Sequence, residues 1–310
     1  MEEVKKKLRE ITGKKNIVFT EKGNAAIKLV LDFAKKNGKK KVLFVTQEME
    51  PYTTLSEISE MVRKLPEHIQ SSGMEIRVLM PRYGTINERR HRLHEVVRLS
   101  GMNIIVDDDD FPLIIKVASL PGARLQVYFL DNEDFFKRKT IFEDEKGNPF
   151  EDNPDRMVFF CKGVVETVRK FGWPPDIIHC HGWMTSLVPV FIREAYKTEP
   201  LFHNSKIIYS VYGNSLGKFF NNGFLTKASI NSLEPDDLSA YLNDGNIRLD
   251  KGAITYADAL IKGSPELPDS LEKTILDSGK PVLDYIDAEN LPSVYVDFYN
   301  SLLEEETVDG

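Results

Sequence analysis

The feature that most constrains the fold is a strand–helix–strand pattern that begins at residue 41. The run KVLFVT (Lys41 to Thr46) is short, apolar and rich in β-branched side chains, which predicts a buried strand. IRVLM (Ile76 to Met80) predicts the next strand, and Gly73 before it is placed as a helix C-cap glycine. Between the two runs, apolar residues recur at helical spacing: Ile58, Met61, Val62, Leu65 and Ile69. This is the length of one βαβ unit, which predicts parallel strands joined by a right-handed crossover.

The same alternation returns in the second half of the chain. Helical and strand-like segments follow one another as helix 156–171, strand 176–181, helix 183–196, strand 206–212, helix 249–256 and strand 259–264. Three apolar runs between residues 96 and 130 have no helical segment between them and predict added strands or hairpins. The whole pattern predicts an α/β domain with a doubly wound, mostly parallel, Rossmann-like sheet. We assign residues 41–310 to this domain, and residues 1–40 to an N-terminal appendage or an extra βα unit.

Composition excludes several classes of function. The formal net charge is −7, whereas proteins that coat nucleic acid carry a basic excess, so we expect no nucleic-acid partner. No run of about 20 apolar residues occurs, so we expect no membrane span, and the N-terminus has no apolar segment of the kind found in secretory signals. Two cysteines, Cys161 and Cys180, give no disulfide framework, so we expect the cytoplasm as the compartment.

The segment PDIIHCHGWM (Pro175 to Met184) holds the densest group of chemically versatile side chains. In a strand, His179 and His181 point to one face and Cys180 to the other. The strand ends here, and ligands of open α/β sheets bind beyond the carboxyl ends of strands. We therefore expect His181 at a site and His179 bonded inside the core. The remaining histidines lack ligand spacing to this pair, so we expect no metal: His68, His91, His94 and His203.

Three other segments are weaker candidates. The loop from Gln47 to Ser59 follows the first strand, where phosphate-binding turns occur, but it has no glycine and several glutamates, which argues against a bound diphosphate. Arg82, after the second strand, could hold an anion or be an ordinary surface arginine in a turn. The run Asp107 to Asp110 lacks the glycine and ligand alternation of a calcium loop, which favours a solvated turn.

Several segments, taken in order, resemble one family. KVLFVTQEMEPY, KLP and GMEIRVLMPRYG come first, then PDIIHCHGWMTSLVPVFI and KGAITYADALIKGSPEL. Together they resemble the N-terminal half of bacterial glycogen synthases and plant starch synthases over roughly residues 41–280. The resemblance implies one half of a GT-B fold. It implies glucosyl transfer from ADP-glucose, or in some members UDP-glucose, to an α-1,4-glucan, with no metal and no cofactor.

The sequence departs from the family motifs at the positions that matter most for catalysis. In the family's phosphate-contacting turn K-T-G-G-L-A-D, the lysine and the two glycines are here Thr54, Ser56 and Glu57. The aspartate of the family's H-x-H-D-W motif is Gly182. The family's His-Asn pair after the next strand is replaced by YSVYGNSLG, which has no histidine, and the family's C-terminal E-x-x-G loop has no counterpart in the sequence.

Carried over residue by residue, the resemblance implies one catalytic position, His181, which retains the second histidine of the motif. It also implies four substrate-binding positions and no metal site: Trp183, Arg82, Thr54 and Tyr212.

With these departures, the resemblance implies a glycosyltransferase domain that is inactive as an isolated chain, because most of the binding energy for a sugar nucleotide in this fold comes from the C-terminal domain and from the phosphate-contacting lysines and glycines. Its expected partners are an α-1,4-glucan or malto-oligosaccharide and a separate chain that supplies the C-terminal half. The alternative is a non-catalytic glucan-binding or regulatory protein derived from the same family. A metal hydrolase built on the two histidines of HCH is the third hypothesis.

Overall fold

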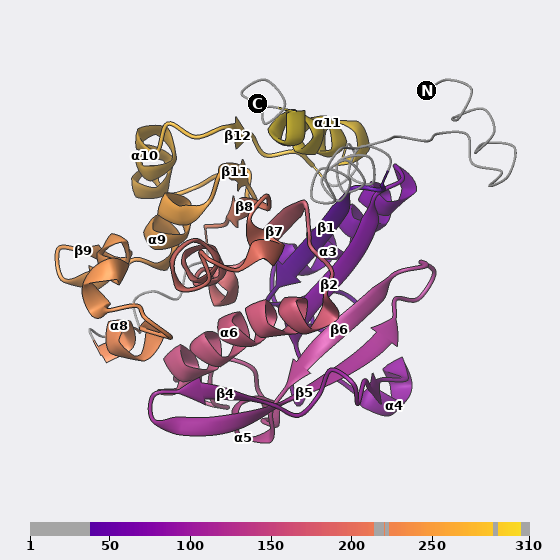
Figure 1. Cartoon of the computed structure of the whole chain (residues 1–310), viewed down its shortest axis with the longest axis vertical. Coiled ribbons are helices and arrows are strands. Elements are labelled where there is room, and N and C mark those ends of the chain that lie inside the picture. Colours follow the sequence, from indigo (N-terminus) through magenta and orange to yellow (C-terminus); the bar gives the residue numbers. More distant parts are fainter. Residues whose placement is uncertain (1–37, 214–219, 221–222, 288–290, 305–310) are drawn as a thin grey trace, which may run out of the picture. The chain divides into compact units, whose positions relative to one another are not determined.

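The computed structural model describes residues 38–213, 220, 223–287 and 291–304. The segment proposed as an appendage or extra βα unit, residues 1–40, lies outside the described residues except for its last three. The main domain is built on one central sheet with helices on both faces (Figure 1). No helix among the described residues is both long enough and apolar enough to cross a bilayer.

The sheet runs in the order β12-β11-β8-β7-β1-β2-β6-β5-β3, with β4 paired to β5. Seven neighbouring strands are parallel: β1 (Lys41–Thr46), β2 (Glu75–Pro81), β6 (Gln126–Asp131), β7 (Ile177–His181), β8 (Lys206–Val211), β11 (Ala259–Lys262) and β12 (Val282–Leu283). Three strands extend the β6 edge in antiparallel fashion: β3 (His94–Glu95), β4 (Met102–Val106) and β5 (Asp109–Ser119). A separate pair is formed by β9 (Leu242–Asn243) and β10 (Asn246–Ile247). The doubly wound, mostly parallel sheet is therefore confirmed.

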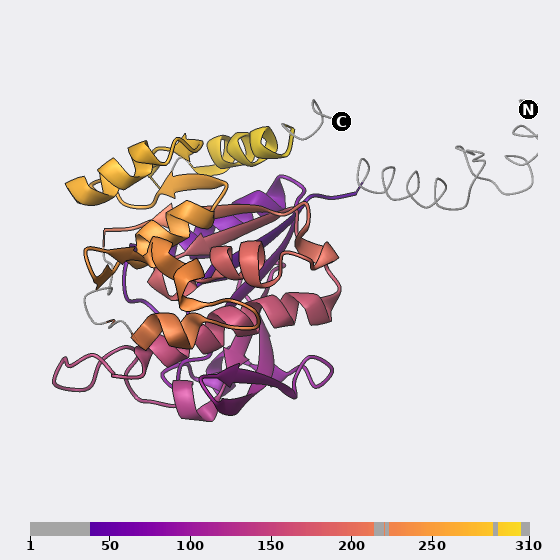
Figure 2. The same ribbon diagram turned by 60° about the vertical axis from the view of Figure 1, so that its left-hand side comes forward.

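Two helices cover one face of the sheet near β1 and β7, and others cover the opposite face. Helix α3 (Glu57–Ser71) and helix α11 (Leu291–Glu304) pack together, and α11 reaches His179 of β7. Helix α6 (Asn153–Phe171) lies on the other face, where the next residue of β7, Cys180, points. Figure 2 shows the yellow helix α11 and the pink helix α6 on opposite sides of the strands.

The remaining helical segments complete these two layers and the loops between them. They are α4 (Glu88–His91), α5 (Glu133–Phe136), η1 (Trp183–Thr185), α7 (Val188–Val190), η2 (Phe191–Ala195), η3 (Pro200–Phe202), α8 (Gly223–Ala228), η5 (Pro235–Tyr241), α9 (Leu249–Tyr256) and α10 (Asp269–Asp277).

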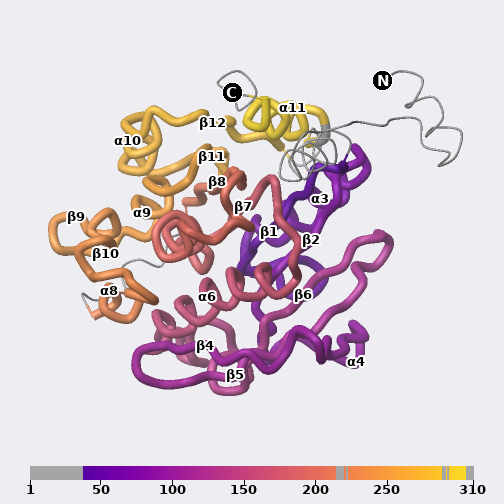
Figure 3. The backbone as a smooth tube through the Cα atoms, viewed as in Figure 1, coloured from indigo at the N-terminus to yellow at the C-terminus, as the bar shows by residue number. Residues whose placement is uncertain are grey.

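The chain reverses its direction of winding between β1 and β7. From β1 it passes through β2 to β6, then returns through α6 to β7 on the other side of β1 (Figure 3). Such a switch point opens a crevice at the carboxyl ends of the two central strands, where open α/β sheets bind ligands. Gln47, which follows β1, and His181, the last residue of β7, lie at this edge of the sheet.

Two predictions of secondary structure need correction. The single helix expected over residues 183–196 is a sequence of three short segments: η1, α7 and a π-helical turn. Pro189 lies in the first turn of α7, where its missing N–H costs nothing, and it prevents a regular helix from continuing through it. The predicted strand over residues 96–106 begins only at Met102. Residues 107–110 join β4 to β5, with Asp107 at φ 57°, as an exposed turn and the start of β5.

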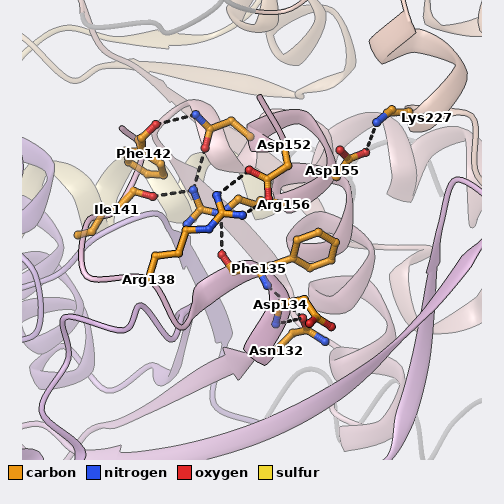
Figure 4. A network of polar contacts seen from close by, with 11 residues as sticks. Asn132, Asp134, Phe135, Arg138, Ile141, Phe142, Asp152, Asp155, Arg156 and Lys227 are labelled. Atoms are coloured by element: carbon orange, nitrogen blue, oxygen red, sulfur yellow. Dashed lines mark hydrogen bonds and ion pairs between the residues drawn. The ribbon is translucent and has the colours of Figure 1, made fainter. Parts of the chain in front are cut away.

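A buried arginine holds the loop that leads into α6. Arg156 is fully buried, and its guanidinium donates to the carbonyl oxygens of Phe135 (2.8 Å) and Ile141 (2.6 Å) and to Oδ1 of Asn153 (2.7 Å). Asn153 in turn donates to the carbonyl oxygen of Phe142 at 2.8 Å. Figure 4 shows Arg156 among Phe135, Ile141 and Phe142. Burial lowers the pKa of Arg156 to about 10, so the group stays cationic at neutral pH. The network fixes the Phe142 ring against the residue that follows the HCHG segment, Trp183.

Candidate functional site

Two histidines of β7 lie near the carboxyl end of that strand, beside the switch point, and both are fully buried. His179 Nδ1 is 2.6 Å from the hydroxyl of Tyr299 in α11, and its Nε2 is 2.7 Å from the hydroxyl of Ser210 in β8. The predicted core role of His179 is confirmed. His181 Nδ1 is 2.9 Å from the hydroxyl of Tyr212, which directly follows β8. The Nε2 of His181 has no hydrogen-bond partner within the described residues.

Both imidazoles are neutral at physiological pH. Their ring centroids are 3.9 Å apart, so two positive charges would repel each other strongly. Burial lowers the pKa of His181 to about 3. The pKa of His179 is also lowered, mainly by burial and to a smaller extent by the neighbouring His181. His181 is therefore a neutral group that can donate or accept a hydrogen bond through its open nitrogen. Because this nitrogen is buried, a ligand reaches it only after covering groups move.

The Gln47 side chain occupies the space that a side chain at position 182 would need. Gly182 has φ 85° and ψ 161°, and a Cβ added to it would lie 2.3 Å from Oε1 of Gln47. The same oxygen accepts a hydrogen bond from the backbone N–H of Met184 at 3.4 Å, and Nε2 of Gln47 donates to Glu48 Oε1 at 3.3 Å. Gly182 is the N-cap residue of η1 but has no side chain to cap it. Gln47 therefore caps η1 from the neighbouring strand.

The loop before α3 is organised by the carboxylate of Glu48, which is fully buried. Its Oε2 accepts the backbone N–H groups of Leu55 at 2.7 Å and Ser56 at 2.9 Å, and its Oε1 accepts the Ser56 hydroxyl at 2.6 Å. Glu57, the first residue of α3, accepts a hydrogen bond from the Ser264 hydroxyl at 2.8 Å. Two backbone amides of this loop are thus bound to an internal carboxylate, and a second carboxylate, that of Glu57, lies at the start of α3.

The structure brings together only some of the residues named as site residues from the sequence. His181 and Tyr212 are in direct contact, whereas Thr54 is exposed in the loop before α3. Trp183 is 4% exposed, and its ring lies 4.8 Å from Phe142, so it is part of the packed interior.

Arg82 is held among charged residues at the end of β2. It forms ion pairs with Glu88 and with Asp131, the latter at 3.3 Å. Lys116 bridges the same two carboxylates at 2.7 Å and 2.8 Å. Two cations thus share two anions, and the charge of Arg82 is already balanced inside the protein. The roles assigned to these residues from the sequence stay predictions.

A cavity of about 1260 Å³ opens beside the end of β8, lined mainly by α9, α10 and the β9–β10 turn. Gly213, which follows Tyr212, lies in its wall. Amide, hydroxyl and cationic side chains contribute to the lining, together with two carboxylates, Asp250 and Asp277, and one aromatic ring: Asn243, Asn246, Arg248, Lys251, Ser270 and Phe220. Such a mixture suits a ligand rich in hydroxyl groups.

No cluster of three or more histidine, cysteine or carboxylate side chains able to hold a metal ion occurs among the described residues.

Sequence reasoning missed three residues of the site. Tyr299 lies 120 positions from His179 in the chain, so no local pattern signals their contact. Ser210 lies on β8, and only the parallel pairing of β7 with β8 brings it beside His179. Gln47 follows β1 and Gly182 follows β7, so it is the pairing of these two strands that brings the residues together.

Comparisons with known proteins agree with this architecture. A family model described as the starch synthase catalytic domain matches residues 41–275. The glycogen synthase of Pelodictyon phaeoclathratiforme is 34% identical over 223 residues, which cover 71% of this chain and 45% of that protein. The glycogen synthase of Chlorobaculum parvum is 36% identical over 228 residues, which cover 73% and 46%. The chain thus spans about half the length of the curated relatives it matches.

A solved structure shows the same fold. The catalytic domain of starch synthase IV from Arabidopsis thaliana, bound to ADP and acarbose, matches with a TM-score of 0.69 at 19% identity, covering 81% of this chain and 52% of that one. At this identity the match supports the GT-B architecture only. With the family model covering most of the domain, the chain belongs to the starch synthase catalytic domain family, the glycosyltransferases that include the bacterial glycogen synthases.

Proposed function

We propose that this chain is an acceptor-side domain that binds an α-1,4-glucan at the carboxyl edge of its sheet and does not bind the diphosphate of a sugar nucleotide at the loop before α3. The expected lack of diphosphate binding is supported by the contact of the Glu48 carboxylate with the backbone amides of Leu55 and Ser56. A diphosphate would have to displace this buried carboxylate and approach the carboxylate of Glu57. Displacing Glu48 is unfavourable because its buried carboxylate would lose its hydrogen bonds, and the exposed carboxylate of Glu57 adds like-charge repulsion.

Glucan binding is supported by the cavity beside Gly213 and by the buried Nε2 of His181, which has no hydrogen-bond partner in the described part of the chain. A neutral imidazole suits an uncharged sugar hydroxyl, and the amide and hydroxyl groups of the cavity suit further hydroxyls. We include the cytoplasm in the proposal, since Cys161 and Cys180 are free thiols buried in the core.

Glucosyl transfer remains a second candidate, favoured by the retention of His181 at the end of β7. Glucosyl transfer would require a further protein domain that binds the ADP-glucose donor. Such a domain is needed because electrostatic stabilisation of the leaving diphosphate is usually the largest contribution to catalysis. Incorporation of labelled glucose from ADP-glucose into glycogen by the purified chain would establish this function and contradict the proposed lack of donor binding.

The proposal is tested by titrating the purified chain with maltoheptaose and, separately, with ADP. We expect maltoheptaose to raise the melting temperature and ADP to leave it unchanged, because only a ligand of the native state stabilises it. A paired variant, Thr54→Lys with Glu57→Gly, restores the charge and the glycine of the family turn at two exposed positions. We expect this variant to respond more to ADP than the wild type does. A wild-type response to ADP with none to maltoheptaose would contradict both halves of the proposal.

A further inference from the structure

The β4–β5 hairpin lies at the opposite end of the sheet from β12 (Figure 1). In the described part of the chain β4 pairs with β5 alone, so the other edge of β4 has no strand partner there. The strand reads MNIIV, without the charged residues or proline that commonly protect sheet edges. Ile105 in this strand is 50% exposed, and Val97 in the loop before it is 78% exposed. An open strand edge with exposed apolar side chains is the arrangement that accepts a strand from another molecule.

The two ends of this edge carry opposite charges. Asp107 to Asp110 lie at the exposed turn that joins β4 to β5. At the other end Arg98 is exposed, and the Lys170 ammonium of α6 donates to the carbonyl oxygen of Ser100 at 3.0 Å. The stretch 89–98, which contains Arg98, holds four arginines and one carboxylate. The edge therefore runs from an acidic turn, along β4, to a basic end.

Neither group of charges is balanced by ion pairs within the described residues. Asp107, Asp108 and Asp109 form no ion pair with a described cation, and the arginines of 89–98 form none with a described carboxylate. Arg82 differs from them, because it is paired with two carboxylates. Both ends of the edge can therefore attract charges of a partner molecule.

A two-fold axis through the middle of β4 brings each end of the edge against the opposite charge. When β4 pairs in antiparallel fashion with the same strand of a second copy, and Ile104 lies on the axis, the strand is paired along its whole length. Asp108 and Ser100 each lie four positions from Ile104, so they come to face each other, and Ser100 is the residue that holds Lys170. Symmetry makes this contact twice. Opposite charges at equal distances from one centre favour a second copy over an unrelated partner.

We propose that this edge is the interface of a symmetric dimer, in which the sheets of two copies of the chain join through β4. Backbone hydrogen bonds between the antiparallel strands hold the dimer together. Asp108 of each copy forms ion pairs with Arg98 and Lys170 of the other. Ile105 lies diagonally across from its own symmetry mate, within reach of an apolar contact. The surface shares no residue with the proposed glucan site, and the dimer does not depend on glucan binding.

The test is sedimentation equilibrium of the full chain and of two variants that each place a lysine at an exposed apolar position. Ile105→Lys puts a charge on the open edge, which is how natural sheet edges avoid pairing. Leu276→Lys is the matched control, because Leu276 is 76% exposed on α10, outside the hairpin. We expect twice the mass of the chain for the wild type and for Leu276→Lys, and the mass of one chain for Ile105→Lys. Circular dichroism checks that all three proteins are folded.

A charge exchange at two exposed positions tests the pairing of the two ends. Asp108→Lys and Arg98→Glu each place like charges against each other, so each alone should weaken dimerisation by about tenfold. Both changes in one chain restore opposite charges across the axis, and dimerisation should recover most of its wild-type strength. Because these charges are exposed, the wild-type dimer should also weaken as the salt concentration is raised.

A wild type that sediments as a single chain at its highest soluble concentration overturns the proposal. A dimer that survives Ile105→Lys also overturns it, because the interface would then lie elsewhere. The same holds if the chain with both charge changes dimerises no more strongly than the two single variants, since the charged ends would then not face each other.

Discussion

Replacing Gly182 with alanine should destabilise the domain through two separate effects. The first is backbone strain, because φ 85° and ψ 161° lie in a region that only glycine occupies readily. Forcing alanine into it costs on the order of 1–3 kcal/mol. The second is a collision, since the new Cβ would lie 2.3 Å from Oε1 of Gln47. Gln47 must then swing away and lose its contacts with Met184 and Glu48.

The magnitude follows from these contacts. The two hydrogen bonds of Gln47 are long, 3.4 Å and 3.3 Å, so we assign each the lower part of the usual range, about 0.5–1 kcal/mol. Together with the strain, Gly182→Ala should lower the free energy of unfolding by about 2–5 kcal/mol. The measurement is urea denaturation followed by circular dichroism.

A double-mutant cycle separates the two effects. Gln47→Ala already loses the two hydrogen bonds, so adding Gly182→Ala costs only the backbone strain. The double variant should be more stable than the sum of the single variants predicts, by about 1–2 kcal/mol. Gly147→Ala is the control: φ is 81° there, but a Cβ would meet nothing within 4 Å. Additive effects of Gly182→Ala and Gln47→Ala, or a Gly182→Ala variant as stable as the wild type, would refute the interpretation.

Three further predictions concern buried polar groups. The pKa of His181 is about 3 in the folded protein and about 6.5 in the unfolded chain. The contribution of neutral His181 to the free energy of unfolding is therefore complete above pH 6.5 and falls by about 1.4 kcal/mol per pH unit toward pH 3. His181→Gln should reduce this slope, measured by urea denaturation at a series of pH values. Asp131→Asn leaves Arg82 and Lys116 short of one negative charge and should cost about 2 kcal/mol of unfolding free energy, with part of the loss recovered at high salt. Arg156→Met leaves buried carbonyl oxygens unpaired and should cost about 3 kcal/mol, measured by thermal unfolding; no loss would contradict the structural role of its network.

Much of the fold was predictable from local patterns. The apolar runs at residues 41–46 and 177–181 are buried strands, and periodic apolar residues marked α3 and α6 correctly. The broken helix after Trp183 was not predicted, because the spacing of apolar residues there is helical while Pro189 interrupts the backbone hydrogen bonds. The spacing of apolar residues indicates which face of a helix is buried, but it does not indicate where the backbone hydrogen bonds of the helix are interrupted.

The candidate site was predicted less completely. Strand alternation placed His179 and His181 on one face, which is correct, but it could not show that both are fully buried. Their partners come from β8 and from α11, and contacts of that separation depend on strand order and helix packing. Residue type alone suggested an anion site at Arg82, whereas tertiary structure gives Arg82 two acidic partners of its own.

The proposed function depends most directly on what the carboxyl edge of the sheet binds. Isothermal titration calorimetry of the purified chain with maltoheptaose and with ADP-glucose tests this in one pair of experiments. We predict saturable binding of maltoheptaose, weakened by His181→Ala, and no measurable heat with ADP-glucose. Saturable binding of ADP-glucose by the wild-type chain, with no binding of maltoheptaose, would contradict the assignment of Glu48 and Glu57 as the groups that exclude a diphosphate.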